Sequence, residues 1–180
     1  MDKHVVGASA RSRMTIHFKI TRPLLSTIRA DLIRPHPFAY ERVGFISASL
    51  SAAANNLFVL ARAYRPVLDE DYLRDPSVGA MMGPEAIRKA LQWAMNDGVA
   101  MFHVHTHGGQ GRPGFSGVDL REQAKYVPNF FQVAPQCPHG ALVLSDNAAY
   151  GHIWLDEKSP YRIVGEFTEV GIPLSQWRAA

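Results

Sequence analysis

The sequence predicts an α+β fold in which strands and helices are mixed along one chain (mixed α/β), and two kinds of pattern support this. Residues 14–20 alternate apolar and polar side chains, which is the period of a half-buried strand, and several later segments also have strand character. Segments 23–34 and 84–97 instead begin at a proline and carry apolar residues on one helical face. A mixture of strands around two helices is typical of this fold class.

Four elements are predicted in the first part of the chain. The strand at 14–20 leads into a helix that begins at Pro23, a residue suited to the first helical turn, and ends before Pro35. Two strands follow at 41–50 and 57–64, joined by a turn rich in alanine and asparagine. The order is therefore strand, helix, strand, strand.

The rest of the chain begins with residues 65–83, which show no clean period and are predicted to form a long functional loop. The remaining elements, in chain order, are a helix from Pro84 to Gly98, a strand at 99–107, a glycine-rich loop, a short helix from Ser116 to about Tyr126, and strands at 141–146, 149–155 and 161–170.

The composition indicates a folded protein with a weak charge bias. The hydrophobic fraction is 47%, the charged fraction 19% and the formal net charge +3 over 180 residues, so a disordered chain and a nucleic-acid binder are both disfavoured. One cysteine, Cys137, excludes an intrachain disulfide. We expect residues 1–13 to form a flexible leader without a signal core and residues 14–180 a single domain. No apolar run approaches the roughly 20 residues that span a bilayer, which predicts a cytoplasmic protein without membrane partners.

A histidine-rich strand and the loop after it form the most informative segment. His105 and His107 lie two residues apart, so on a strand they share one face, with Cα atoms roughly 6.5–7 Å apart, and can converge on one ion. The glycine-rich loop lets the chain turn back, so that Ser116 can cap the next helix and Asp119 sits in its first turn. Two imidazoles and one carboxylate are a donor set typical of catalytic zinc, which keeps a fourth position open.

Glu41 is the candidate catalytic base, because it opens an apolar strand where a lone carboxylate is otherwise hard to explain.

Each of these sequence signals also has a simpler interpretation. A His-x-His pair can be two exposed side chains, and Ser-x-x-Asp can be a helix cap alone. The liganding pair could also be His103 and His105; with His105 and His107 as the pair, His103 becomes a pocket residue or supports the ligands from behind.

Four residues outside this segment also have metal-binding or polar side chains. Cys137 and His139 flank a proline and could form a second metal site, although a loop with a buried thiol is the simpler interpretation. His17 and His152 alternate with apolar residues and are predicted to face the solvent.

The order Glu, His-x-His, Ser-x-x-Asp resembles the JAMM metalloproteases, the catalytic branch of the JAB/MPN domains. The matching residues are Glu41 with Gly44, His105 with His107, and Ser116 with Asp119. The chain departs from the family pattern in two ways: the loop before Ser116 is one residue longer than usual, and Gly108 stands where the family usually has proline. The resemblance implies an MPN/JAB-like central sheet flanked by helices, with cytidine-deaminase-like layering, over about residues 14–155.

The resemblance also implies a function. His105, His107 and Asp119 would bind one zinc ion per chain, Glu41 would activate a water molecule, and Ser116 would polarise the scissile carbonyl and stabilise its oxyanion. The protein would then be a deubiquitinase-like isopeptidase that hydrolyses the amide bond after the C-terminus of a ubiquitin-like protein, in precursor processing or in deconjugation. Its partners would be that modifier and its conjugates, and bacterial relatives act in conjugation systems that include antiphage (antiviral) defence.

Two other functions stay open. Related MPN-type domains serve as non-catalytic binding or scaffold modules, although these typically lose the ligands that this sequence retains. A RadC-like JAMM hydrolase would act on another substrate. The 65–83 loop lies where relatives carry an insertion that guides the substrate tail as an added strand, and its alternative is a disordered loop. The identity of the modifier and the oligomeric state are left open.

Overall fold

The computed structural model describes residues 14–36, 40–75 and 77–178, so the predicted leader at 1–13 lies outside the described part. In chain order the elements are β1 (Thr15–Thr21), α1 (Arg22–Leu32), β2 (Val43–Ala53), β3 (Asn56–Pro66), a 3-10 turn (Asp69–Asp71), β4 (Tyr72–Leu73), β5 (Met81–Met82), α2 (Pro84–Asp97), β6 (Ala100–Thr106), α3 (Gly117–Val133), β7 (His139–Leu144), β8 (Ala149–Trp154), β9 (Arg162–Ile163), β10 (Glu166–Val170) and β11 (Ser175–Arg178). The described strands form one mixed sheet, in the order β11-β10-β1-β3-β2-β6-β7-β8-β9, and a separate β4–β5 hairpin. The predicted α+β class is confirmed.

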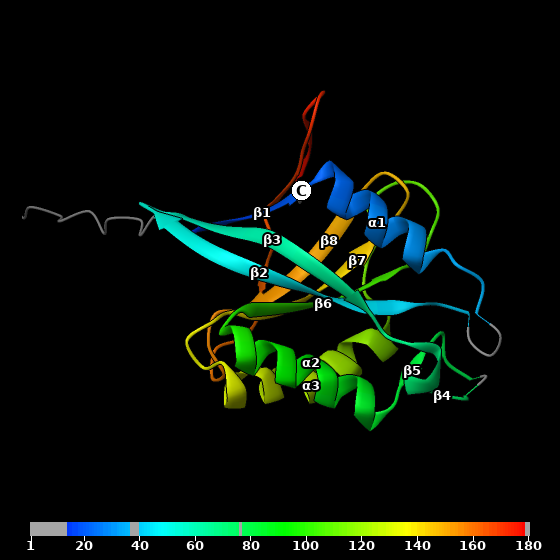
Figure 1. Cartoon of the computed structure of the whole chain (residues 1–180). Coiled ribbons are helices and arrows are strands. Elements are labelled where there is room, and N and C mark those ends of the chain that lie inside the picture. The colour runs from blue at the N-terminus through cyan, green and yellow to red at the C-terminus, as the bar shows by residue number, and fades with distance from the viewer. Residues whose placement is uncertain (1–13, 37–39, 76, 179–180) are drawn as a thin grey trace, which may run out of the picture.

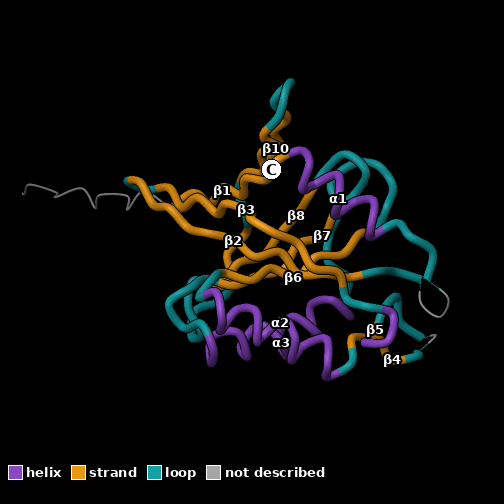
Figure 2. The backbone as a smooth tube through the Cα atoms, viewed as in Figure 1, coloured by secondary structure: helices purple, strands orange, loops and turns teal. Residues whose placement is uncertain are grey.

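The helices cover opposite faces of the sheet (Figure 1, Figure 2). α1 lies on one face, and α2 and α3 lie together on the other. Side chains alternate between the two faces along a strand, so β2 and β6 contribute to both cores. Ile46 and Phe102 belong to the core with α1, whereas Phe45 and Met101 belong to the core with α2 and α3. The odd-numbered residues of β6 therefore point toward α2 and α3, and this places His103 and His105 on that side.

The sheet curls so that its two ends approach each other. The backbone N–H of Val164 donates to Gly151 O on β8, and that of the next residue, Gly165, donates to Ile16 O on β1, both at 2.9 Å. The prediction of a single strand at 161–170 is therefore wrong. The segment divides into β9, which pairs with β8, and β10, which pairs with β1. The division occurs because the two halves find their hydrogen-bonding partners at opposite ends of the sheet order.

Three further elements differ from the sequence prediction. α3 continues past Tyr126 to Val133 with Pro128 inside it, because its buried face extends through Phe130 and Phe131. That burial offsets the roughly 3 kcal/mol cost of an internal proline. The terminal strand β11 was not predicted. Within 65–83, the described residues form a 3-10 turn and the β4–β5 hairpin, so the loop carries structure of its own.

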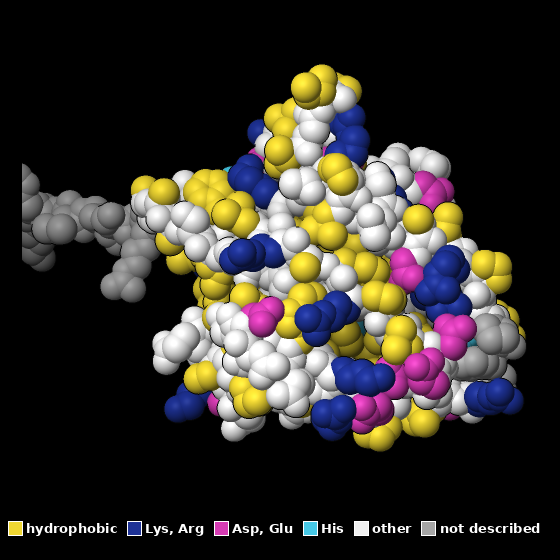
Figure 3. Space-filling view, in the orientation of Figure 1, with side chains coloured by type: hydrophobic (Ala, Val, Ile, Leu, Met, Phe, Trp, Pro, Cys, Tyr) yellow, Lys and Arg dark blue, Asp and Glu magenta, His cyan; other side chains and the backbone are white. Residues whose placement is uncertain are grey.

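Charges of both signs alternate on the face of the molecule seen in Figure 3, where Lys and Arg side chains lie beside Asp and Glu around α2. Two of the pairs are Arg88 with Glu85, at 2.6 Å, and Lys89 with Asp71, at 2.7 Å. This face differs from the one-signed surfaces typical of nucleic-acid binding.

His139 at the start of β7 is completely buried and uses both ring nitrogens. Its Nδ1 accepts a hydrogen bond from the Met101 N–H at 3.1 Å, and its Nε2–H donates to Ala134 O at 3.0 Å. Only the neutral ring can make both bonds, and burial lowers the pKa of His139 to about 4. The alternative of a second metal site formed by Cys137 and His139 is therefore wrong, because neither ring nitrogen of His139 is available to an ion.

We expect the free energy of unfolding to decrease as the pH falls from about 6.5 to about 4. In this range His139 takes up a proton in the unfolded chain but stays neutral in the folded one, so acid favours the unfolded state by about 1.4 kcal/mol per pH unit. Urea unfolding of the wild type and of His139→Gln at several pH values measures this contribution. His103 and His152 also have lowered pKa values, but they contribute equally in the wild type and in the variant. The difference between the two proteins in the slope of unfolding free energy against pH therefore isolates His139. Equal slopes would contradict the assignment.

Candidate metal centre

The antiparallel pairing of β2 with β6 brings the predicted base next to the predicted ligands. Val43 lies opposite His105 in this ladder. Glu41 lies two residues before Val43, and His107 lies two residues after His105. Continuing the antiparallel register beyond the ends of the two strands therefore places Glu41 opposite His107. One ligand atom from each of Glu41, His105 and His107 lies within 4.8 Å of the others. Residues far apart in the sequence thus meet at one end of two neighbouring strands.

Asp119 completes the group from the first turn of α3. His105 Nε2 and His107 Nε2 are 3.1 Å apart, and the nearest Asp119 oxygens lie 3.4 Å from the first and 3.5 Å from the second. Donors bound to a tetrahedral ion at about 2.0–2.1 Å are separated by about 3.3–3.4 Å. The separation of the two imidazoles and the distance from each imidazole to its nearest Asp119 oxygen are close to this value, so the three side chains lie at the spacing of ligands around one small cation.

Ser116 holds Asp119 in place as the N-cap of α3. The Ser116 N–H donates to Asp119 Oδ2 at 2.6 Å, and the Asp119 N–H donates back to Ser116 Oγ at 3.2 Å, which is a reciprocal capping box. Burial alone would raise the pKa of Asp119, but the hydrogen bonds and charge of His105, together with Ser116, hold this pKa well below its usual range. The hydrogen bonds that cap α3 therefore also hold Asp119 beside the two histidines. The low pKa means that the Asp119 carboxylate is ionised.

The loop between His107 and the cap is anchored to the turn between β7 and β8. The N–H of Asp146 donates to Gly109 O at 2.9 Å, and Ser145 Oγ donates to Gly111 O at 2.6 Å. Gly108, Gly109 and Gly111 have φ values of 62°, 69° and 87°, a region that side chains disfavour. These glycines turn the chain back toward the donor group.

Two donor sets share the histidine pair, one completed by Asp119 and the other by Glu41. We favour Asp119 as the third ligand, because its Oδ1 lies 3.4 Å from His105 Nε2 and its Oδ2 lies 3.5 Å from His107 Nε2. The ligand atoms of the set with Glu41 all lie within 4.8 Å of one another. A carboxylate in this range can act on a water molecule held beside an ion, which is the role of a base.

A cavity of about 230 Å³ opens beside the donors, between the sheet and the two helices that cover it. Its walls are largely apolar and come from β2, the β4–β5 hairpin, α2 and α3. The apolar residues along it are Val43, Val78, Ala80, Met81, Met82, Ile87 and Val118. Glu41, His105 and Asp119 lie at the same cavity, so an extended, apolar ligand segment in it would reach the ion site directly.

His103 belongs to the cavity wall and not to the donor group. Its ring lies between Phe45 and Tyr126, with centroids at 5.6 Å and 5.1 Å, and only 7% of the residue is exposed. Burial, reinforced by the positive charge of His105 when protonated, lowers the pKa of His103 to about 3, so its ring is neutral. Among the described residues its Nε2 has no hydrogen-bonding partner. The structure brings together His105 and His107, and the alternative pair His103 and His105 is not the one that meets Asp119.

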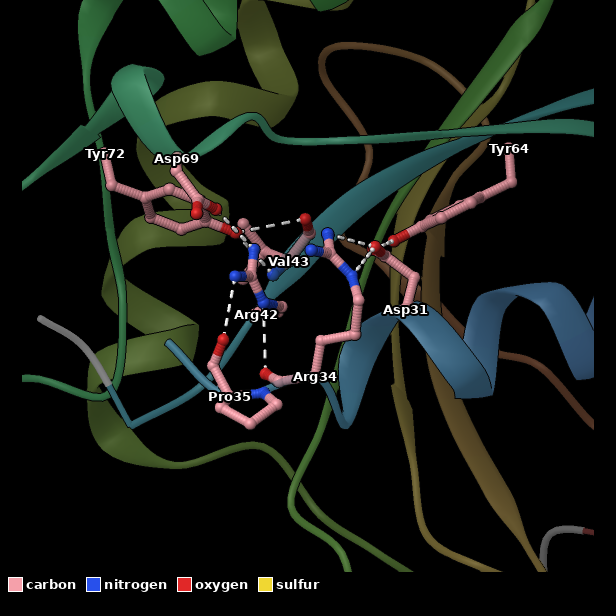
Figure 4. A network of polar contacts seen from close by, with 8 residues as sticks. All are labelled: Asp31, Arg34, Pro35, Arg42, Val43, Tyr64, Asp69 and Tyr72. Atoms are coloured by element: carbon pink, nitrogen blue, oxygen red, sulfur yellow. Dashed lines mark hydrogen bonds and ion pairs between the residues drawn. The ribbon is translucent and has the colours of Figure 1, made fainter. Parts of the chain in front are cut away.

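The segment that carries Glu41 is fixed by a polar network shown in Figure 4. The buried Arg42 guanidinium donates to Arg34 O at 3.1 Å, to Pro35 O at 2.9 Å and to the Asp69 carboxylate at 2.6 Å. Tyr72 Oη accepts from the Val43 N–H at 2.9 Å. The two residues that follow Glu41 are therefore tied to the segment after α1, to the 3-10 turn and to β4. Sequence reasoning missed this network, because neither Arg42 nor Tyr72 belongs to a recognisable motif.

His152 was predicted to face the solvent and is instead 3% exposed, so that prediction is wrong. Its Nδ1 lies 3.2 Å from Gln123 Oε1, and its ring stacks on Tyr161 at 3.8 Å and lies 4.6 Å from Phe115. His17 is half-buried and stacks on Phe58. Both histidines alternate with apolar residues along their strands, as expected. The strand face that carries each histidine is nevertheless covered by aromatic side chains from other segments.

Comparisons with known proteins give no family assignment. Neither a protein-family model nor a curated protein matches the chain. Among solved structures, the chain is similar to the Trichoplax adhaerens STIL N-terminal domain, with 10% identity and a TM-score of 0.36. The match covers 74% of this chain and 39% of that one, so this chain spans about two fifths of that structure's length. A likeness of this degree carries no argument about function.

Among the described residues, no helix has the length and apolar character needed to cross a membrane.

Proposed function

We propose that this protein is a zinc-dependent peptidase of the JAMM type. The observation that carries the proposal is the convergence of His105, His107 and Asp119 at 3.1–3.5 Å separations with Glu41 next to them. Three protein donors leave one tetrahedral position open, as in catalytic rather than structural zinc sites. An MPN/JAB-like layering of the α+β fold is part of the same proposal.

Zinc is the ion that this donor chemistry suits best. Neutral imidazoles and a single carboxylate are its usual catalytic ligands, whereas calcium and magnesium prefer sites made of oxygen donors alone. A bound zinc ion would act as a Lewis acid, lowering the pKa of a water molecule and polarising the substrate carbonyl. His105, His107 and Asp119 would hold the ion, and the capping box at Ser116 would keep the carboxylate directed at it.

Glu41 and Ser116 then supply the proton transfers and the hydrogen bonding. Glu41 takes the proton from the attacking water on its carboxylate and delivers it to the leaving amine nitrogen. Ser116 Oγ already accepts the Asp119 N–H, so its own hydroxyl hydrogen is free to donate to the carbonyl oxygen as negative charge develops there. The apolar residues of the cavity lie on the side of the site on which Glu41 lies.

The substrate we propose is the extended C-terminal tail of a ubiquitin-like protein, cleaved at the amide bond after its last residue. The β4–β5 hairpin supports this, because Met81 and Met82 line the cavity that leads to the donors. A short strand beside such a cavity can bind an extended tail through its backbone. The same chemistry serves both precursor processing and removal of the modifier from a target.

A cleavage assay tests this function. The substrates are a panel of ubiquitin-like proteins, each fused through its C-terminus to a reporter, with a free peptide ester as a general control. We expect cleavage after the tail, a loss of more than about 100-fold on treatment with a chelator, and recovery on addition of zinc alone. Binding of the panel without chelator-sensitive hydrolysis would point to a scaffold module. Cleavage of only the small ester would point to another substrate class, as in a RadC-like hydrolase.

A further inference from the structure

Gly79, in the segment between the β4 and β5 strands, lies directly against the carboxyl group of Glu41. A Cβ atom added at Gly79 would lie 2.6 Å from Glu41 Cδ and 2.7 Å and 2.9 Å from its two oxygens. Real Cβ contacts do not come this close, so any side chain at position 79 must displace the carboxylate. The absence of a side chain at Gly79 is thus a condition for the observed position of Glu41.

The backbone of Gly79 holds the same residue from the main-chain side. Gly79 O accepts hydrogen bonds from the N–H groups of Tyr40 and Glu41, both at 2.9 Å. The neighbours Val78 and Ala80 line the cavity beside the donors, so the segment forms a wall of the site. Glu41 is therefore fixed at its N–H by the Gly79 carbonyl and limited at its carboxylate by the Gly79 Cα.

The hairpin that carries Gly79 is in turn tied to the strand that carries Glu41. Tyr72 Oη on β4 bonds the N–H and the carbonyl of Val43, at 2.9 Å and 3.3 Å. Gly83, after β5, donates to Asp71 O at 2.8 Å, and the Asp71 carboxylate pairs with Lys89 of α2. The connections from α2 through the hairpin to β2 therefore set where Gly79 lies.

We propose that Gly79 is a positioning residue for the Glu41 carboxylate, and that the β4–β5 hairpin thereby sets the geometry of the base as well as lining the cavity. This rests on the proposed function, in which Glu41 moves the proton. The inference differs from a tail-binding role of the hairpin, because it predicts a defect in the chemical step and not in substrate affinity.

Gly79→Ala tests the inference. The displaced group is the end of a flexible side chain, so the fold should tolerate the change, with a fall in the unfolding midpoint of less than about 5 °C. We expect unchanged zinc content, kcat reduced by about 100-fold, and KM within about threefold of the wild type, because a shift near 1 Å misplaces the base. A crystal structure of the variant should show the Glu41 carboxylate moved away from residue 79. Gly165→Ala is the matched control, since its Cβ meets its nearest neighbours at an ordinary 3.5 Å.

A double-mutant cycle separates this inference from the proposed function. If Gly79 acts through Glu41, then Gly79→Ala adds no further loss in a Glu41→Gln background. Additive losses, a wild-type kcat in Gly79→Ala, or an unmoved carboxylate in its crystal structure would each overturn the inference while the proposed function stands. Full activity of Glu41→Gln would instead overturn the proposed function. The displaced carboxylate is observable without any activity.

Discussion

His107→Ala will lose the metal and the hydrolytic activity together. In the proposed site His107 is one of three donors, and its removal would leave an imidazole and a carboxylate that bind zinc weakly. We expect zinc affinity to fall by more than about 100-fold, which exceeds the cost of losing a group that only supports a ligand. Its side chain is 29% exposed, so the fold should survive the change better than after substitution of the 2%-exposed His105. Metal analysis of the purified protein and the tail-cleavage assay measure both effects.

His17→Ala is the control for this variant. It removes a half-buried imidazole from β1, whose partners are Glu166, Asn56 and the Phe58 ring, away from the donors. Zinc content and cleavage should match the wild type. One zinc ion per chain in His107→Ala, with cleavage preserved, would rule out the assigned donor set.

Glu41→Gln will keep the metal and lose the chemistry. The amide has nearly the shape of the carboxylate but cannot take up a proton, so kcat should fall by about 10²–10⁴-fold, the usual contribution of a general base. Zinc content should stay at the wild-type level, because Asp119 and the two histidines supply the ligands. Steady-state kinetics and metal analysis of the same preparation measure the two quantities. Glu85→Gln, which disrupts only the exposed pair with Arg88 on α2, serves as the control.

The metal content of this variant also decides between the two donor sets. Retained zinc with lost activity identifies Glu41 as the base. Loss of zinc would show that Glu41 is the third ligand, as its 4.8 Å clustering with His105 and His107 permits, and would contradict the role we assign to Asp119.

Much of the first half of the fold could be predicted from the sequence, because its signals are local. Alternation at 14–20 and prolines at the starts of α1 and α2 mark elements without reference to distant residues. Gly98 ends α2 in the left-handed conformation, as expected for a helix C-terminus. The division of 161–170 could not be predicted, because it depends on which distant strands accept its hydrogen bonds.

The candidate site was partly predictable for the same reason. The spacing of His105 and His107 and the capping pattern from Ser116 to Asp119 are both local, and the structure brings all four residues together. Glu41 was a candidate because it opens an apolar strand. Its position beside the histidines could not be derived, since strand register does not follow from one sequence without pairing information.

Gly79 gave no sequence signal. It lies in a segment without periodicity, and its importance depends on a carboxylate 38 positions earlier in the chain. Contacts of this kind are invisible to pattern analysis, because a missing side chain is informative only when its neighbour in space is known.

With the proposed metal site, the pairing of β2 with β6 would link metal supply to the lifetime of the protein. In the unfolded chain only His105 and His107 remain close together, while Asp119 lies 12 residues beyond them and Glu41 lies 64 residues before them. An ion that needs all the donors therefore binds the native state almost exclusively, and each tenfold rise in its free concentration above the dissociation constant adds about 1.4 kcal/mol to stability. Under metal starvation the chain would then open more often, and proteases would remove the metal-free protein before the metal-bound one.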